Sequence, residues 1–272
     1  MPHYSFYEDR DYLLEYNQVA LDNITPVDIL GVKITNLSRT QATVVIMDMI
    51  EKGGTYHVLP LNPWKLEKTK SGQKNKTVFS TVDLMIAEGA GLQWAAKKLK
   101  TPLKERIPLL SLMMDLVRIS ELKEYTIFLI GGKPETTELA YKNIKRSFPN
   151  IRIVGRHGGF FDSEREKDVI EAIRKSEANI VFVGMGFPIE DRWIHKIRKE
   201  FRHTVFISVG GTLDVIAGKR KSSTFMIERG LDWFYRIITR PWRFGRFLRT
   251  LKFFIHARLR GFRVKKKSKK LL

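Results

Sequence analysis

The sequence predicts an α/β fold, a Rossmann-like, mostly parallel sheet flanked by helices, with a basic helical C-terminal appendage. Three observations support this prediction. Short runs of Ile, Val and Phe end at glycine turns, which is typical of strands buried on both faces. These runs alternate with amphipathic helical patterns, the order expected of a parallel sheet. Positive charge is concentrated near the C-terminus, which divides the chain into residues 1–218 and residues 219–272.

The N-terminal half of the predicted sheet has the less regular pattern. Residues 32–34, 42–46 and 56–60 are short apolar runs between polar turns, and they predict three strands. Residues 81–87 form another apolar segment, which leads into Glu88 and Gly89. A helix pattern follows, with apolar side chains on one face and lysines on the other: Leu92, Ala95, Ala96 and Leu99 against Lys97, Lys98 and Lys100.

Three strand–turn–helix units come next, and a last strand follows them. The predicted strands are residues 125–130, 151–154, 180–183 and 205–209. Because parallel strands all end at the same edge of a sheet, their turns should gather there, where α/β proteins bind ligands. The glycines of these turns are Gly131, Gly132, Gly184, Gly186, Gly210 and Gly211.

The charge of the chain points to a polyanionic partner. Lys and Arg number 49 against 29 Asp and Glu, a net charge of +20. Residues 219–272 contain 18 of these basic residues and only two acidic ones, which leaves residues 1–218 nearly neutral. Such asymmetry is typical of binding to nucleic acid or to an anionic membrane surface. With no cysteine in the chain, disulfides, thiolate metal sites and a cysteine nucleophile are excluded.

The appendage shows an aromatic and aliphatic stripe beside a cationic one. Phe244, Phe247, Leu251 and Phe254 illustrate the first, and the second repeats every three residues: Arg240, Arg243, Arg246, Arg249 and Lys252. This pattern is typical of a helix lying in a membrane interface. Docking on the domain and nucleic-acid binding remain alternatives, although the wide apolar face favours lipid over nucleic acid.

The expected location is cytoplasmic, peripheral on the inner face of the cell membrane. No run of 18 or more apolar residues is present, so no membrane-spanning helix is expected. Residues 1–10 include Glu8 and Asp9 and have no apolar core, so we expect no secretory signal there.

A few residues are candidates for chemistry. The glycine turns allow a phosphate to approach backbone amides, although tight turns after strands are the more ordinary interpretation. Glu88 is a candidate general base, or else a carboxylate that stabilises a helix N-terminus. Arg106 is a candidate phosphate clamp, or an ordinary surface arginine. The six histidines lack metal-ligand spacing, so we expect no protein-held metal and no cofactor.

Several short motifs, taken in order, resemble the WecG/TagA/CpsF family of bacterial glycosyltransferases from about Tyr56 to Arg249. The motifs that carry the resemblance are Phe128-Leu-Ile-Gly-Gly-Lys-Pro134, Phe148-Pro-Asn-Ile-Arg-Ile-Val-Gly155, Val183-Gly-Met-Gly-Phe-Pro188, Val209-Gly-Gly-x-x-Asp214-x-x-Ala-Gly218 and Gly230-Leu-Asp-Trp-Phe-Tyr-Arg236.

The resemblance implies metal-independent, inverting transfer of an N-acetylhexosamine, typically N-acetylmannosamine, from a UDP-sugar to a polyprenyl-pyrophosphate-linked sugar. Residues 1–218 would be the catalytic domain. The appendage would bring the enzyme to the membrane and help to close the site, and self-association is common in the family. The resemblance implies Glu88 as base with Arg106. The substrate-binding residues it implies are Asn62, Gly89, Gly131, Gly132, Gly184, Gly186, Glu190, Gly210, Gly211, Asp214, Arg236, Arg243 and Arg246.

The chain departs from the family pattern mainly at these site positions. Pro60 replaces a threonine, Glu88 an aspartate and Glu190 a glutamine, and the position of Ser111 lacks the family's aspartate. An ionised Glu190 would repel a diphosphate, whereas burial would keep it protonated. We interpret the chain as an active transferase whose specificity these departures alter. A weakly active or non-catalytic relative that binds lipid-linked pyrophosphate is the first alternative, and a nucleic-acid-binding protein the second.

Overall fold

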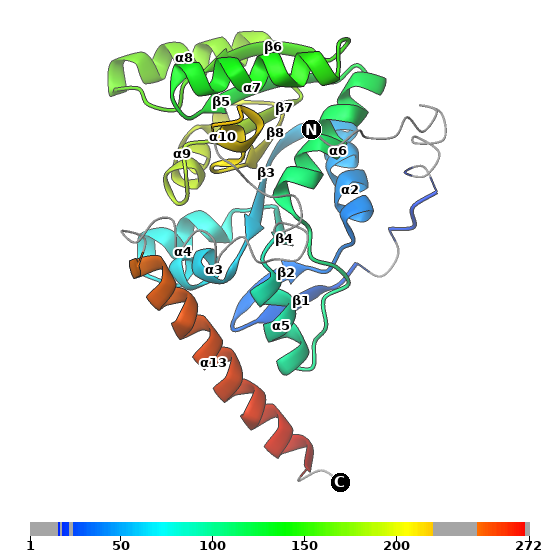
Figure 1. Ribbon diagram of the computed structural model, residues 1–272, viewed down its shortest axis with the longest axis vertical. Helices are drawn as coiled ribbons and strands as arrows, with labels where there is room; N and C mark the ends of the chain where they lie inside the picture. Colours follow the sequence, from blue (N-terminus) through cyan, green and yellow to red (C-terminus); the bar gives the residue numbers. More distant parts are fainter. Residues whose placement is uncertain (1–15, 17, 22–23, 220–243, 270–272) are drawn as a thin grey trace.

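The computed structural model describes residue 16 and residues 18–21, 24–219 and 244–269 of the chain. Its centre is a six-stranded sheet in the order β4-β3-β8-β7-β5-β6, and every neighbouring pair is parallel (Figure 1). The predicted α/β class with a parallel sheet is confirmed. The strands are β3 (Gly54–Leu61), β4 (Leu84–Ala87), β5 (Thr126–Gly131), β6 (Arg152–His157), β7 (Ile180–Gly184) and β8 (His203–Ser208).

Helices cover both faces of this sheet. One face is covered by α2 (Arg39–Lys52), α6 (Leu109–Leu122), α7 (Pro134–Ser147) and α10 (Thr212–Ile216). The other face is covered by α3 (Pro63–Thr69), α4 (Gln73–Ser80), α8 (Ser163–Ser176) and α9 (Ile189–Ile197), which η1 (Arg198–Glu200) follows. An antiparallel hairpin of β1 (Pro26–Ile29) and β2 (Val32–Thr35) and the helix α5 (Ala90–Lys98) lie by the β4 edge.

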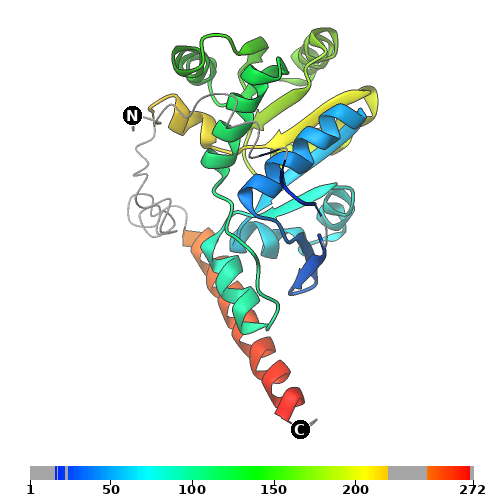
Figure 2. The ribbon, with the colours of Figure 1, turned by 90° about the vertical axis from the view of Figure 1, so that its right-hand side faces the viewer.

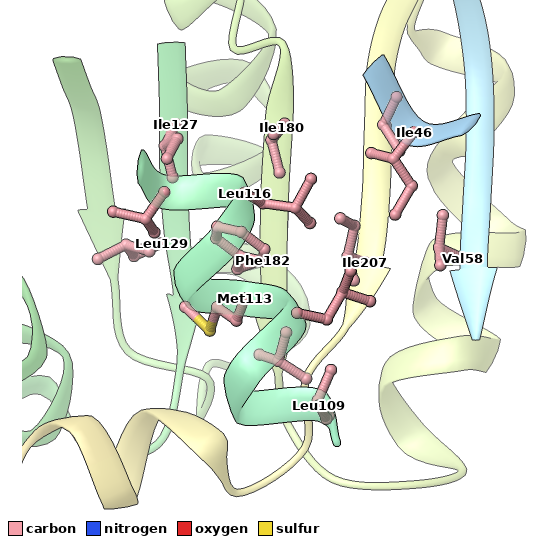
Figure 3. Close-up of a cluster of buried hydrophobic side chains, with 14 of the residues drawn as sticks. Ile46, Val58, Leu109, Met113, Leu116, Ile127, Leu129, Ile180, Phe182 and Ile207 are labelled. Carbon is pink, nitrogen blue, oxygen red and sulfur yellow. The ribbon is translucent and has the colours of Figure 1, made fainter. Parts of the chain in front are cut away.

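The two-sided burial of the strands explains their continuous apolar runs. In β5, Ile127 and Leu129 contribute to the core under α6, whereas Phe128 and Ile130 contribute to the core under α8 and α9. Figure 3 shows α6 lying across the first of these faces, with Leu109, Met113 and Leu116 directed at strand side chains. Since alternate residues of a strand point to opposite faces, both sets must be apolar.

The prediction of a strand at residues 42–46 is wrong, because this segment lies inside α2. Its β-branched residues favour a strand only weakly, since β propensity depends on context. Ser38 begins the helix with a capping box: its hydroxyl accepts from the Gln41 amide, and the Gln41 side chain accepts from the Ser38 amide. Ala42 and Ile46 are four residues apart and fully buried, so one helical face enters the core.

The helix predicted in the C-terminal segment is present as α13 (Phe244–Lys269). It packs against α3 and α5, and its far end extends beyond the rest of the described chain (Figures 1 and 2). Phe253 and Ala257 are fully buried in this contact, and the ring of Phe254 lies 5.1 Å from that of Trp94 in an edge-to-face arrangement. Docking on the domain therefore occurs along one face of α13.

The residues that the structure describes leave a second, outer face of α13 uncovered. It carries an apolar stripe whose members are each between 43% and 58% exposed: Leu248, Leu251, Ile255, Leu259 and Phe262. Among the residues that the structure describes, no helix combines the length and the hydropathy needed to cross a membrane.

The strand order also creates a switch point in the sheet. After β5 the chain moves outward to β6, whereas after β7 it moves the other way to β8, and β5 and β7 are neighbours. Adjacent parallel strands whose connections leave in opposite directions open a crevice beyond their carboxyl ends. The register pairs Gly131 with Gly184 at this place.

Candidate active site

Asn62 and Glu88 meet at the β3/β4 end of the carboxyl edge. The register pairs Leu61 with Ala87, the last residues of the two strands, so the next residues of each chain segment are neighbours. The Asn62 side chain begins α3 by accepting a hydrogen bond from the Lys65 amide (3.0 Å). Its Nδ2 then donates to Glu88 Oε2 at 3.3 Å. Since the cap fixes the amide oxygen, the NH2 group is held toward the half-buried carboxylate.

Three helices converge beside this pair. A Cβ on Gly89 would lie 2.8 Å from Pro63 Cδ, and one on Gly91 would lie 2.6 Å from Pro63 Cγ and 2.9 Å from the Phe254 ring. Any side chain at Gly91 would therefore push α3, α5 or α13 apart. This close approach links the docking of α13 to the two segments that carry Asn62 and Glu88.

The glycine turns after β5, β7 and β8 pack backbone against backbone. A Cβ on Gly131 would lie 2.5 Å from Gly184 Cα, and one on Gly184 would lie 2.8 Å from the Gly210 carbonyl oxygen. The Gly132 amide donates to the Gly184 carbonyl at 3.1 Å. Gly186 has φ of +88°, which glycine adopts without strain, and a side chain there would meet open space. The turns thus form one continuous strip of backbone at the switch point.

Glu190 lies beneath this strip and is fully buried. Its Oε2 accepts from the amides of Gly186 (2.9 Å) and Gly210 (3.1 Å), so one carboxyl oxygen joins two turns. Burial, and then the adjacent charge of Asp191, raise the pKa of Glu190 to about 8, against the opposing effect of Lys65 and the two amides. At neutral pH the side chain is therefore mainly protonated, the state that the sequence predicts if Glu190 is buried.

A buried polar network continues from Glu190, and its members were not predicted from the sequence. Asp191 Oδ1 accepts from the Ser208 hydroxyl (2.7 Å) and lies 3.4 Å from His57 Nε2. Lys65 donates to the Pro60 carbonyl (2.9 Å) and lies 5.6 Å from the centre of the Phe187 ring. The sequence signal that could have identified these residues is a polar residue inside an apolar strand, as with His57 in β3 and Ser208 in β8.

The remaining predicted residues are distributed as follows. Arg106 is half-buried and precedes Ile107, whose amide donates to Ala87 at the end of β4 (2.8 Å), so the backbone of Arg106 passes close to Glu88. Gly211 and the half-buried Asp214 belong to the start of α10, after β8.

Three predicted arginines cannot be placed in the site. Arg236 and Arg243 lie outside the described residues, and of Arg246 only the backbone, in the first turn of α13, is described. Within the described ranges, no group of three or more His, Asp or Glu side chains is arranged to hold a metal ion.

Comparison with known proteins agrees with the motifs. Residues 27–268 match the profile of the Glycosyl transferase WecG/TagA/CpsF family. The chain is 30% identical over 250 residues to a Staphylococcus aureus (strain NCTC 8325 / PS 47) protein named N-acetylglucosaminyldiphosphoundecaprenol N-acetyl-beta-D-mannosaminyltransferase. That match covers 91% of this chain and 97% of the relative. The protein of the same name from strain MRSA252 is also 30% identical over 250 residues. With a profile match over nearly its whole length, the chain belongs to the WecG/TagA/CpsF family of glycosyltransferases.

Proposed function

We propose that this glycosyltransferase moves an N-acetylhexosamine, N-acetylmannosamine or a close analogue, from a UDP-sugar to a polyprenyl-diphosphate-linked sugar during synthesis of a cell-surface polysaccharide. The observation that carries the proposal is the Asn62–Glu88 hydrogen bond at the carboxyl edge of the sheet. The names of the Staphylococcus aureus relatives support the sugar and the acceptor.

Glu88 is the general base of the proposed reaction. Its carboxylate takes the proton of the acceptor hydroxyl while the hydroxyl oxygen forms a bond to the anomeric carbon. The bond from that carbon to the diphosphate oxygen breaks on the opposite side, and UDP leaves with the electron pair. Attack opposite the leaving group inverts the anomeric carbon. Asn62 holds Glu88 in place through its NH2 group.

The leaving diphosphate needs positive groups around it. The glycine strip lets the diphosphate approach the backbone closely, and we assign Arg106, Arg236, Arg243 and Arg246 to the diphosphates of donor and acceptor, in line with a metal-independent reaction. Neighbouring strands lie about 4.8 Å apart, so Glu88 and the Gly184 turn are separated by about 14 Å along the edge. An extended nucleotide-sugar spans such a distance, with its diphosphate toward the glycine strip and its sugar toward Glu88.

The acceptor is a lipid, and α13 provides a surface suited to a membrane. Its outer apolar stripe (Leu248, Leu251, Ile255, Leu259 and Phe262) is accompanied by exposed cations at Arg249, Lys252, Arg258 and Arg260. An apolar stripe flanked by cations favours an anionic bilayer surface. We therefore place the enzyme peripherally on the inner face of the cell membrane, with residues 219–272 as the membrane-associating part.

A donor screen tests the proposed activity. Purified enzyme, a soluble analogue of the polyprenyl-diphosphate sugar and a panel of UDP-N-acetylhexosamines should release UDP with at least one donor. Release must depend on the acceptor, which excludes simple hydrolysis. Tight binding of the acceptor analogue without UDP release from any donor would instead support a non-catalytic, lipid-diphosphate-binding role.

Vesicle sedimentation tests the membrane assignment. The double variant Ile255→Ser/Leu259→Ser should bind anionic vesicles at least about tenfold more weakly, because each apolar side chain moved out of water contributes about 1.5–3 kcal/mol. Leu139→Ser is the matched control, since Leu139 is an exposed apolar residue on α7. Equal vesicle binding by all three proteins, or salt-sensitive DNA binding instead, would contradict the assignment.

A further inference from the structure

Glu190 is named above for its expected contact with the donor, yet its geometry indicates a different role. Both N–H groups that it accepts come from glycine turns, and both point at the same oxygen, Oε2. The other oxygen, Oε1, is buried and has no hydrogen-bond partner among the residues that the structure describes. Since two donors already occupy Oε2, a proton on this carboxyl group belongs on Oε1.

The charged groups around Glu190 come from each element packed against it. On α9 itself the neighbours are Asp191 and Arg192, and Arg192 donates to Asn75 of α4 at 2.7 Å. Helix α3 contributes the buried ammonium of Lys65, and β3 contributes His57. From β8 comes Ser208, which is polar but uncharged in this pH range.

These partners are divided unequally between the two acidic residues. Burial alone would raise the pKa of Asp191, but its hydrogen bonds and charge interactions with His57, helped by Lys65 and Ser208, hold it below the usual value. Glu190 shares only the charge of Lys65 among these partners, and it also faces the charge of Asp191. One buried negative charge therefore resides on Asp191, and Glu190 stays neutral.

We propose that Glu190 is a neutral positioning residue that fastens the Gly186 and Gly210 turns together, and that its ionisation weakens binding of the UDP-sugar. The inference rests on the function proposed above. An ionised Glu190 would leave Oε1 charged and without a donor, next to Asp191. It would also place a negative charge directly beneath the strip assigned to the diphosphate. Either effect opposes donor binding.

The dependence of the donor KM on pH tests this inference. In the wild type, the donor KM should rise about tenfold between pH 7 and pH 9, because roughly nine-tenths of a group that ionises near pH 8 is charged at pH 9. Glu190→Gln keeps an oxygen for the two amides but cannot ionise, so its ratio of KM values at pH 9 and pH 7 should stay near one. An unchanged rise in Glu190→Gln would overturn the inference.

Lys65→Met gives a second test, in which the direction of the shift along the pH scale is predicted. Because the ammonium of Lys65 favours the ionised form of Glu190, its removal should move the rise in KM to higher pH. Glu164→Gln, on the exposed side of α8, is the control and should follow the wild type. A shift to lower pH in Lys65→Met would contradict the proposed arrangement.

A readout without substrate separates this inference from the proposed function. A carboxyl group whose pKa is raised by folding binds its proton in the native state only, between its usual pKa and about pH 8. The melting temperature of the wild type should therefore fall relative to Glu190→Gln as the pH rises from 5 to 8, and the gap should then stay constant. A gap that is constant from pH 5 to 8 would overturn the buried proton, whether or not any donor is turned over.

Discussion

Two glutamates lie at different places along the carboxyl edge of the sheet, and they differ in nearly everything but their side chain. Glu88, at the β3/β4 end, is half-buried and bonded by the side chain of Asn62. Glu190, beneath the turns that follow the central strands β7 and β8, is fully buried and bonded by two backbone amides. The environment thus leaves one carboxyl group partly accessible and makes the other a part of the scaffold.

The largest expected effect is on kcat, and it is expected at Glu88, the more accessible of the two glutamates. Glu88→Gln keeps the size and the hydrogen-bonding oxygen of the side chain but removes the base, so kcat for UDP release should fall by about 10²–10⁴-fold. Thermal stability should change little. Glu164→Gln on α8 serves as the control and should keep full turnover. Wild-type turnover in Glu88→Gln would remove Glu88 from the chemistry.

Truncating the buried Glu190 should mainly lower the free energy of unfolding. Glu190→Ala removes a fully buried side chain that is the acceptor of the half-buried Gly186 and Gly210 amides, and each lost hydrogen bond costs about 0.5–1.5 kcal/mol. Urea unfolding should therefore show a clear loss in the free energy of unfolding, whereas Glu88→Ala should show almost none. Similar losses in both variants would mean that the environments of the two glutamates do not differ as described.

Asn62 belongs to both a helix cap and the Glu88 pair, and two substitutions separate these roles. Asn62→Ala should lose about 1 kcal/mol of stability with the cap, and should also lower kcat. Asn62→Asp keeps an oxygen for the Lys65 amide but places a like charge beside Glu88, so stability should be retained while kcat falls. Unfolding curves and UDP release, measured on both variants, check this. Equal kcat in Asn62→Asp and the wild type would show that the Asn62–Glu88 bond has no part in turnover.

The sheet was predictable because it depends on local pattern. Apolar runs ending at glycines mark the strands, and Glu88 stood out because it follows such a run directly, whereas Asn62 was identified only through the family resemblance. The segment at residues 42–46 was mispredicted because its β-branched residues obscured a four-residue spacing of Ala42 and Ile46. The capping box at Ser38 was the better signal there.

The burial of Glu190 was harder to predict, because it depends on how α9 is rotated about its axis. Glu190 and Asp191 occupy a first helical turn, where acidic residues are usually solvent-exposed and stabilise the helix dipole. Trp193, Ile194 and Ile197 are also buried, so the inward face of this short helix includes both acids and apolar residues. No periodic pattern distinguishes such a face, and the partners His57, Lys65 and Ser208 come from distant segments.

The docking of α13 has a consequence for how the protein is made. This helix is synthesised well after α3 and α5, yet it covers both of them. The apolar surface around Gly91 and Trp94 therefore stays uncovered until α13 has been synthesised, and exposed apolar surface promotes aggregation in that interval. A chain that stops before α13 would leave this surface uncovered. The segment between Asn62 and Glu88 thus reaches its final packing only after α13 has left the ribosome.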